Sequence, residues 1–517
     1  MAEQISNLVE MVDSVVPHFS QRVCLIFGAK KITYGELSTY SKKLAQGLYT
    51  LGVRQNDKVA LWLSNCPEFV YSFFAVLRLG ATVVPINTMF KREEAKFVVE
   101  DSGAKILICP IEKADDCQNI LSRLDILEYV VCNPFPHKNP SFRDFYSLIQ
   151  DAPEFSSSVN IAQDSIAELV YTSGTTGRPK GACLSHKNLL SNTKDCAESI
   201  KATKRDCFLC VLPLFHSFAS TVCMLLPLSV GARIVIMRAV RPFKRVIRSI
   251  FKRKVTVFTG VPSLYSILSE AKFPRFALFA SYVMNPIRLC ISGAAALPYN
   301  VWKKFEKKFR RPLLQGYGLT EASPVVSLNP LRGKRKPESV GVCIPSMSAK
   351  IIDSDGRQLK EGEVGELLVQ GPNVMKSYHH AEEETKKVLR DGWLYTGDLA
   401  KIDEDGFIYI MGRLKEMINV RGMNVYPREI EDVLYRHPQV REAAVVGTTH
   451  RHRGEVPVAF LVKEGELSSK DVIDYLRVNV AAYKVPLKIV FKETLPKNPT
   501  GKILKRELQK EVEGAFK

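Results

Sequence analysis

The sequence predicts an α/β protein with more than one domain. Its 517 residues exceed what one hydrophobic core usually supports. Apolar strand-like runs alternate with helical stretches over residues 1–110 and again over 232–300, which is typical of parallel sheets covered by helices. Short strands and Gly/Asp turns follow over 339–411 and favour a small antiparallel, barrel-like subdomain. We therefore expect a large N-terminal domain, made of two βαβ-type sheet subdomains and this β-barrel-like one, and a smaller α+β C-terminal domain.

The elements of the N-terminal half follow from their apolar patterns. Residues 59–63 and 81–85 predict strands, and the segment between them predicts a helix over 66–79. Further strands are expected near 234–236 and 255–258. The apolar positions of the predicted helix include Phe69, Phe73, Phe74 and Leu77.

The C-terminal part changes pattern after Gly412. A helix is expected near 428–437, with strands near 443–447 and 457–463. No internal repeat interrupts this order. The sequence therefore predicts a large domain over 1–412, a connection over 413–415 and a second domain over 416–517.

Composition and charge limit the classes of function. Hydrophobic residues make up 46% and charged residues 25% of the chain, as in ordinary globular proteins. A net charge of +19 favours anionic partners such as nucleotides, coenzyme phosphates, acidic lipid or nucleic acid. Twelve cysteines without regular spacing argue against a zinc site or a disulfide framework. The first residues lack a signal-peptide layout, so we expect a cytoplasmic location.

One uncharged segment has two interpretations. Residues 207–232 contain no Lys, Arg, Asp or Glu and are long enough for a membrane span. Pro213, Pro227 and His216 interrupt the segment, which a lipid-facing helix tolerates poorly. We favour a buried strand, loop and helix, with the membrane span as the alternative.

Residues 171–181 form the most informative segment, Tyr-Thr-Ser-Gly-Thr-Thr-Gly-Arg-Pro-Lys-Gly. Glycines turn backbone N–H groups toward a ligand, hydroxyls add donors, and Lys180 adds a positive charge. The lysine follows Pro179 and so cannot open a helix as the Walker-type lysine does. The segment therefore predicts a polyphosphate-binding loop behind a strand at 166–170, with a plain Gly/Ser/Thr turn as the alternative.

Five downstream motifs accompany this loop in order. They are Gly316-Tyr317-Gly318-Leu319-Thr320-Glu321, Tyr395-Thr396-Gly397-Asp398, Gly412-Arg413-Leu414-Lys415-Glu416, Asn419-Val420-Arg421-Gly422 and Pro499-Thr500-Gly501-Lys502. Together they resemble the acyl-adenylate-forming family, which includes acyl-CoA synthetases, peptide-synthetase adenylation domains and firefly luciferase. Residues 181–188, 256–265 and 424–431 resemble its bacterial medium- and long-chain fatty acid–CoA ligases.

This resemblance implies ATP, Mg²⁺ and coenzyme A as cofactor and co-substrates. In such enzymes a carboxylate attacks the α-phosphate of ATP, so cations and donors must neutralise the developing charge. The resemblance assigns Glu321 and Thr172 to the metal and to catalysis, and Thr320 to the α-phosphate; a carboxylate suits Mg²⁺ because this ion prefers oxygen ligands. The residues implied for the β- and γ-phosphates are Thr172, Ser173, Gly174, Thr175, Thr176 and Lys180.

The resemblance also implies the rest of the nucleotide site. Asp398 would accept both ribose hydroxyls, Arg413 would reach the ribose–phosphate region, and Lys502 would be the catalytic lysine that bridges carboxylate and α-phosphate. Taken alone, each has a plainer interpretation as a turn residue or a solvated lysine. The adenine site is implied at Gly293, Ala294, Ala295, Gly316, Tyr317 and Gly318.

The acyl and coenzyme A sites rest on the same resemblance. Phe215 and His216 resemble an aromatic gate beside the acyl pocket, although a histidine in an apolar run is more often a core residue. Rotation of a mobile C-terminal domain about the hinge residue Lys415 would remove Lys502 and present Arg421, Gly422 and Met423 to coenzyme A. The basic run 448–453 replaces a usually acidic position, and it either binds a coenzyme A phosphate or is a surface loop.

Several readings of function stay open. The leading one is an AMP-forming fatty acid–CoA ligase; the alternatives are an acyl-AMP ligase that loads a carrier protein, an aromatic acid–CoA ligase, and a non-catalytic lipid- or nucleic-acid-binding protein. No standard nucleic-acid motif is present, so no nucleic-acid partner is expected. A predicted helix over 240–252 has a basic face that suits peripheral docking on anionic membranes. Acyl chain length and oligomeric state are not determined.

Overall fold

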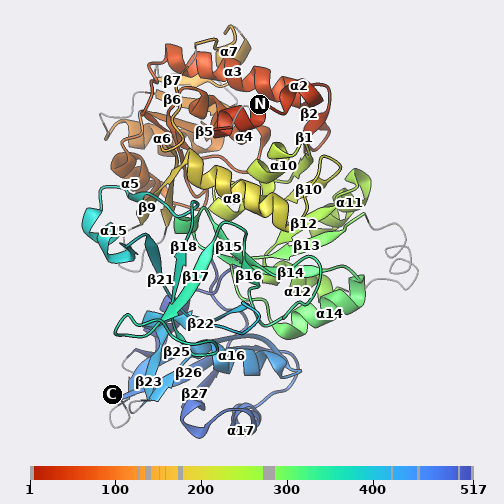
Figure 1. Cartoon of the computed structure of the whole chain (residues 1–517), viewed down its shortest axis with the longest axis vertical. Helices are drawn as coiled ribbons and strands as arrows, with labels where there is room; N and C mark the ends of the chain where they lie inside the picture. The colour runs from red at the N-terminus through yellow and green to blue at the C-terminus, as the bar shows by residue number, and fades with distance from the viewer. Residues whose placement is uncertain are drawn as a thin grey trace.

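Two mixed sheets and their helices form the larger part of the molecule, and a smaller domain lies at the other end of its long axis (Figure 1). In this computed structural model the structure describes residues 5–124, 129–133, 141–150, 152–157, 159–172, 179–271, 286–420, 423–450, 454–498 and 501–513. The N-terminal helices lie at one end of the long axis, and the C-terminal domain lies at the opposite end.

The first sheet has eight strands in the order β19-β9-β8-β4-β3-β5-β6-β7. Its inner strands are parallel, as the alternating pattern predicted, and the predicted helix at 66–79 forms as α4 with every residue except Glu68 buried. Its strands are β3 (Lys58–Leu61), β4 (Thr82–Pro85), β5 (Ile106–Pro110), β6 (Tyr129–Asn133), β7 (Phe142–Asp144), β8 (Ile166–Thr172), β9 (Lys180–Ser185) and β19 (Ser377–Tyr378). The helices of this part are α1 (Leu8–Asp13), α2 (Val16–Phe19), α3 (Tyr34–Thr50), α4 (Pro67–Arg78), α5 (Arg92–Ser102), η1 (Ile111–Lys113), α6 (Ala114–Leu121), α7 (Ser147–Gln150) and α8 (His186–Ser199).

The second sheet has nine strands in the order β16-β15-β14-β13-β12-β10-β11-β1-β2. Its strands are β1 (Val23–Phe27), β2 (Lys30–Thr33), β10 (Cys207–Cys210), β11 (Arg233–Ile236), β12 (Val257–Gly260), β13 (Leu289–Ser292), β14 (Leu313–Gly318), β15 (Val325–Leu328) and β16 (Val342–Cys343). Its helices are α9 (Ser217–Ala219), the π-helix η2 (Ser220–Leu225), α10 (Leu226–Ser229), α11 (Phe243–Arg253), α12 (Pro262–Glu270), α14 (Tyr299–Phe309) and the 3₁₀ turn η3 (Thr320–Ala322).

The uncharged segment 207–232 lies inside this second subdomain. It forms β10, a turn and the short helical pieces α9, η2 and α10, and most of its side chains are buried. Thr221 in η2 donates to the carbonyl of Ser323, which ties the segment to the loop after η3. The favoured interpretation is therefore confirmed. None of the helices in the described part of the chain has the length and apolar character that a bilayer crossing needs.

The predicted barrel-like subdomain is an open antiparallel sheet, β17-β18-β21-β20, with β22 paired to β21. Its elements are β17 (Ser348–Ile352), β18 (Gly365–Gln370), α15 (Glu382–Val388), β20 (Leu389–Arg390), β21 (Trp393–Ile402) and β22 (Ile408–Arg413). One part of 339–411 departs from the prediction, because β19 leaves this sheet and pairs with β9 of the first. The sequence gives no sign of this exchange, since a two-residue strand carries no periodicity.

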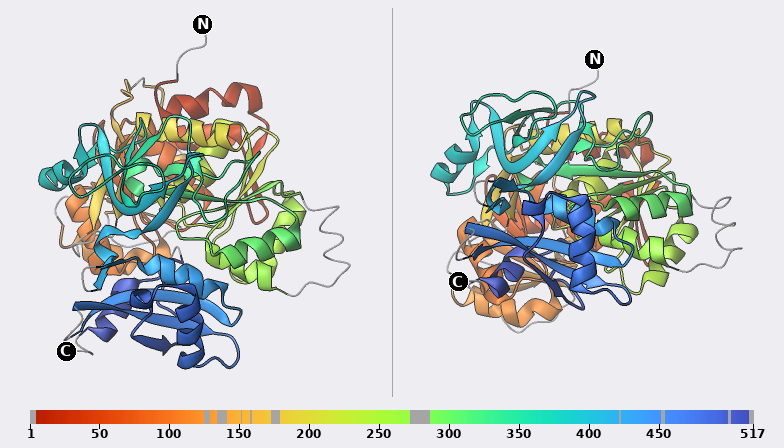
Figure 2. Two further views of the ribbon diagram at one scale, coloured as in Figure 1. Left: turned by 60° about the horizontal axis from the view of Figure 1, so that its bottom comes forward. Right: turned by 90° about the horizontal axis from the view of Figure 1, so that it is seen from below.

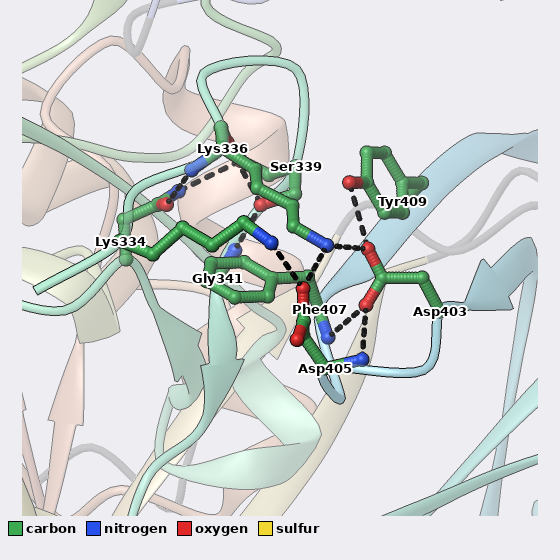
Figure 3. A network of polar contacts seen from close by, with 9 residues as sticks. Lys334, Lys336, Ser339, Gly341, Asp403, Asp405, Phe407 and Tyr409 are labelled. Atoms are coloured by element: carbon green, nitrogen blue, oxygen red, sulfur yellow. Dashed lines mark hydrogen bonds and ion pairs between the residues drawn. The ribbon is translucent and has the colours of Figure 1, made fainter.

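A polar network connects the turn between β21 and β22 to the loop before β16, which carries Lys334 and Lys336 (Figure 3). Lys336 contacts Asp403 and lies 2.6 Å from Asp405, which also pairs with Lys334 at 2.7 Å. Tyr409 donates to Asp403 at 2.9 Å. The network fixes one end of the β21–β22 hairpin, and the other end carries two residues of the candidate site.

The C-terminal domain is α+β, as predicted, and has its own apolar clusters. Figure 2 shows it as a distinct body, and α16 contacts α14 and β22 of the larger part. Its strands run longer than the sequence predicted, because paired edges extend beyond the apolar run. Its elements, after the turn η4 (Leu414–Glu416), are β23 (Ile418–Val420), β24 (Met423–Val425), α16 (Pro427–Arg436), β25 (Val440–His450), β26 (Gly454–Lys463), α17 (Ser469–Asn479), η5 (Ala482–Lys484), β27 (Lys488–Phe491) and α18 (Lys505–Val512).

Candidate active site

The β8–β9 hairpin carries the glycine- and hydroxyl-rich loop. Thr172 ends β8 and Lys180 begins β9, and the two are register partners. Thr172 Oγ1 donates to the carbonyl of Lys180 at 3.4 Å. The residues between them that were predicted to bind phosphate lie outside the described residues: Ser173, Gly174, Thr175 and Thr176. The hairpin therefore holds both described ends of the predicted loop side by side, where β8 ends and β9 begins.

A second group surrounds Glu321 in η3. Glu321 Oε1 accepts a hydrogen bond from Tyr378 Oη at 2.7 Å, and Thr320 Oγ1 lies 3.4 Å from Ser217 Oγ. Gly318 is required before this turn, because a Cβ there would lie 2.0 Å from the carbonyl oxygen of Pro324. The hydrogen bond between Glu321 and Tyr378 joins η3 to β19, and β19 pairs with β9. Glu321 and Lys180, the first residue of β9, therefore lie on neighbouring elements.

The third group joins β14 to the β21–β22 hairpin. Asp398 and Arg413 are register partners, and Arg413 Nε lies 2.7 Å from Asp398 Oδ1. Tyr317 Oη donates to Asp398 Oδ2 at 2.5 Å. The Asp398 side chain is only 5% exposed, so its charge depends on these partners. Burial and the Asp398 carboxylate raise the pKa of Tyr317, which keeps this phenol protonated as a donor.

A partly open cavity lies beside these groups, with about 650 Å³ of empty space that includes open solvent at its mouth. Five predicted adenine-site residues line it, whereas Ala295 does not: Gly293, Ala294, Gly316, Tyr317 and Gly318. The cavity continues inward between α8 and η2, where Cys196, Ile200, Val222 and Leu226 form its wall. Cys196, Ile200 and Leu226 were not predicted as lining from the sequence, because helical spacing alone describes core residues equally well.

His216 and Phe215 occupy different positions relative to this cavity. His216 lines it, but Phe215 is buried outside the lining, and Phe218 contributes an aromatic ring instead. His216 Nδ1 accepts a hydrogen bond from the Phe218 amide at 3.3 Å. Burial and the charge of Lys502 lower the pKa of His216 to about 4, so its ring is neutral near pH 7.

Lys502 reaches this region from the C-terminal domain. Asn498 shapes its loop by accepting from the Lys502 amide through Oδ1 at 2.8 Å. A Cβ on Gly501 would meet Ser263 Oγ of α12 at 2.9 Å, which shows how closely the loop approaches the large domain. Burial and Arg413 lower the pKa of Lys502, whereas Asp398 raises it. Protein atoms of the large domain crowd the lysine although its side chain is still exposed, and it interacts electrostatically with both His216 and Asp398.

The predicted hinge and coenzyme A residues are placed only in part. Lys415 lies in η4 between β22 and β23, and Arg413 is still the last residue of β22. Met423 begins β24 and is 48% exposed. Arg421 and Gly422 lie outside the described residues. In the basic run, Thr448 is buried and donates to the carbonyl of Val512, and residues 451–453 also lie outside the described part.

Comparison with known proteins decides the family. The model of the AMP-binding enzyme matches residues 12–379, and that of the AMP-binding enzyme C-terminal domain matches residues 429–502. The chain belongs to the AMP-binding enzyme family. It is therefore an adenylate-forming acyl- or aryl-CoA ligase by family, and such enzymes use ATP, Mg²⁺ and coenzyme A.

The relatives of this AMP-binding enzyme differ in the acid that their names state. It is 36% identical to a long-chain-fatty-acid–CoA ligase of Bacillus subtilis, with 98% of this chain and 94% of the relative covered. It is 35% identical to a 4-coumarate–CoA ligase of Pinus taeda, with 96% and 93% covered. The structure of ATP-bound MatB from Rhodopseudomonas palustris matches with a TM-score of 0.91 at 31% identity, covering 99% of this chain and all of that one.

The side chains expected at the metal have the chemistry that Mg²⁺ prefers. Glu321 would offer a carboxylate and Thr172 a hydroxyl, and both are oxygen ligands. Tyr378 was missed by the sequence analysis, although it contacts both the Glu321 carboxylate and, through its ring 5.5 Å away, the Lys180 ammonium.

Proposed function

We propose that the protein is an AMP-forming fatty acid–CoA ligase that activates a medium- or long-chain fatty acid. The observation that supports this substrate class is the lining of the cavity, which contains no Lys, Arg, Asp or Glu. A second carboxylate or an ammonium on the acid would be desolvated there without a partner, whereas an alkyl chain gains from burial. The name of the Bacillus subtilis relative agrees with this proposal.

In the proposed first step, an oxygen of the fatty carboxylate attacks the α-phosphorus of ATP. The bond to the pyrophosphate oxygen breaks, and acyl-AMP and pyrophosphate result. Lys180 and the loop from Thr172 to Thr176 hold the β- and γ-phosphates, and Thr320 contacts the α-phosphate. Glu321 and Thr172 would hold Mg²⁺, which would supply positive charge to neutralise the phosphates.

The remaining residues position the nucleotide and the nucleophile. Asp398 accepts the ribose hydroxyls, Arg413 orients that carboxylate, and Lys502 stabilises charge between the carboxylate and the α-phosphate. The pair of Asp398 and Arg413 at 2.7 Å supports this assignment, since it preforms the acceptor before ATP binds. The neutral ring of His216 at the cavity mouth contacts the acyl end without adding charge.

In the proposed second step, the sulfur of coenzyme A attacks the acyl carbon, and AMP leaves as the thiol loses its proton. We assign the arrangement in which Lys502 interacts electrostatically with His216 and Asp398 to the adenylation step, so the thiol would enter only after the C-terminal domain turns. We assign that turn to Lys415 within 413–415, between the domains 1–412 and 416–517, with Arg421, Gly422 and Met423 lining the route of the thiol arm.

An acid panel tests the proposal. ATP-dependent loss of the coenzyme A thiol is measured with acetate, octanoate, palmitate, benzoate and 4-coumarate. We expect kcat/KM to rise by orders of magnitude from acetate to octanoate or palmitate, since each buried methylene contributes about 0.8 kcal/mol. A preference for benzoate or 4-coumarate would instead establish an aromatic acid ligase. Acyl-AMP formation without thioester would establish loading of a carrier protein.

A second, independent proposal concerns a membrane surface. Helix α11 buries Val246 and Ile250 against the domain and exposes a basic face with Phe251 at its edge, 41% exposed. Exposed basic side chains beside an exposed aromatic ring suit peripheral binding to anionic lipid. Vesicles with and without phosphatidylserine test this, and an absence of salt-sensitive co-sedimentation would refute it. The exposed basic residues of α11 and its flanks are Arg241, Lys244, Arg245, Arg248, Lys252 and Lys254.

A further inference from the structure

The lysine of the proposed phosphate loop is already bound to an anion of the protein itself. Lys180 Nζ forms a direct ion pair with Glu384 Oε2, across 204 residues of sequence. The Lys180 side chain is 20% exposed and that of Glu384 is 36% exposed. Lys180 is therefore the more enclosed partner, and it is the group that gains more from a nearby negative charge.

Backbone pairing and one side chain hold Glu384 in this place. Strand β19 pairs with β9, the strand that Lys180 opens, and the His379 amide donates to the carbonyl of Gly181 at 2.7 Å. Thr385 Oγ1 accepts from the Tyr378 amide at 2.9 Å and so ties α15 to β19. The pairing of β19 with β9 and the hydrogen bond from β19 to Thr385 therefore fix α15 beside Lys180. The position of Glu384 follows from this backbone arrangement.

Glu384 has a second cation that does not belong to the proposed site. Lys387 Nζ donates to Glu384 Oε1 at 2.9 Å, one helical turn along α15. The two lysines together lower the pKa of Glu384 to about 2, so the acid is ionised at any working pH. When Lys180 leaves, Lys387 still pairs with the carboxylate in contact with solvent. Release of Lys180 therefore leaves the Glu384 carboxylate still paired with one cation, Lys387.

We propose that Glu384 occupies Lys180 in the nucleotide-free enzyme and that the triphosphate of ATP takes this lysine from it. The exchange deepens the proposed function, since it rests on Lys180 as a phosphate ligand. The exchange replaces one anion by another around the same ammonium. Glu384 therefore competes with the β- and γ-phosphates, and this competition raises the ATP concentration that is needed to fill the site. No bond is made or broken in this step.

Tyr378 links this exchange to the metal site. Its ring lies 5.5 Å from Lys180 Nζ, and its hydroxyl donates to Glu321. The ring therefore stands between the lysine that is exchanged and the carboxylate that is proposed to hold Mg²⁺. Movement of Lys180 toward the phosphates is opposed by the loss of this cation–π contact as well as by Glu384.

The variant Glu384→Gln tests the exchange, with Glu383→Gln as the matched control. Glu383 precedes it on the same helix and pairs with Lys386 on the solvent side, so both variants remove one negative charge from α15. The dissociation constant of ATP with Mg²⁺ is measured by calorimetry without any acid, at low and high sodium chloride. We expect Glu384→Gln to tighten binding about three- to fivefold at low salt, and less at high salt. Glu383→Gln should change it little.

A double-mutant cycle with Lys180→Met completes the test. Once Lys180 is absent, Glu384→Gln should no longer tighten ATP binding. Unchanged or weaker binding by Glu384→Gln, or equal tightening by Glu383→Gln, overturns the exchange. Wild-type ATP binding by Lys180→Met would also overturn the exchange, because Lys180 would then be no phosphate ligand. The proposed function fails in a different way, since the wild-type protein would then form no acyl-AMP with any acid of the panel.

Discussion

The variant Asp398→Asn separates a structural role of this carboxylate from its proposed role in binding ribose. Asp398 lies 2.7 Å from Arg413 and accepts from Tyr317 at 2.5 Å, and its side chain is 5% exposed. Two unit charges about 4 Å apart interact by about 4 kcal/mol at an effective dielectric constant near 20. Arg413 is 34% exposed, so solvent screening leaves a net loss of about 1–2 kcal/mol of unfolding free energy.

The effect on ATP is expected to be larger than the effect on folding. The asparagine keeps the shape of the carboxylate but offers only one acceptor oxygen for two ribose hydroxyls. A hydrogen bond to a charged group is worth about 1.5–3 kcal/mol, so the KM for ATP in ATP–pyrophosphate exchange should rise about tenfold to a hundredfold. Melting temperature and exchange kinetics are measured on the same preparations.

The control is Asp403→Asn, in the turn of the same hairpin. It removes a carboxylate that is paired with Lys336 and Tyr409 at the turn of the hairpin, whereas Asp398 pairs with Arg413 and Tyr317 at the other end (Figure 3). The melting temperature should fall for both variants, and the KM for ATP should rise only for Asp398→Asn. If Asp398→Asn melts lower but keeps the wild-type KM, the carboxylate is structural and its assignment to ribose is wrong.

Three further predictions follow from single side chains. Lys502→Met should lower the rate of ATP–pyrophosphate exchange about 10²–10³-fold. The control Lys497→Met breaks an ion pair with Glu442 in the same domain and should leave this rate unchanged. Equal losses in both variants would count against a catalytic Lys502. Glu168 is fully buried without a hydrogen-bond partner, and burial raises its pKa from 4.5 to about 8. Its unfolded form ionises first, so stability should fall as the pH rises from 4.5 to 8, by about 3 kcal/mol at pH 7, and Glu168→Gln should flatten this dependence of melting temperature on pH. Gly318→Ala should abolish exchange, because its Cβ would lie 2.0 Å from the carbonyl oxygen of Pro324, whereas Gly103→Ala meets open space and should cost only stability; wild-type kinetics in Gly318→Ala would contradict the geometry of η3.

Periodic and local features were predictable from the sequence. Alternating apolar runs predicted the parallel strands and the buried helix α4, and they also separated the α+β C-terminal part from the rest. The uncharged stretch 207–232 was correctly predicted as buried, since its prolines and hydroxyls do not suit lipid. The motif order also predicted one nucleotide site from Thr172, Lys180, Tyr317, Glu321, Asp398 and Lys502, and this assignment stays a prediction, although Tyr317 lines the cavity and contacts Asp398.

Contacts between distant segments were beyond the sequence. Glu384, the partner of Lys180, is 204 residues away in the sequence. Their pairing depends on β19 joining the first sheet, and a two-residue strand has no periodicity from which this could be predicted. Phe218 rather than Phe215 lines the cavity, because the chain turns into α9 at His216 and reverses the direction of its side chains. The inner wall at Cys196, Ile200 and Leu226 likewise required two helices to be placed side by side.

The sequence by itself determined the chemistry of this protein: an α/β scaffold with a phosphate loop, an acidic metal ligand and a distant lysine, in the order of an AMP-binding enzyme. Only the tertiary structure decided which charges meet and what the cavity excludes. Local patterns report burial and backbone conformation over a few residues. Strand register and helix packing, by contrast, fix side chains that lie hundreds of residues apart. Asp398 meets Arg413, and Glu384 meets Lys180, only because the sheets are paired in this register.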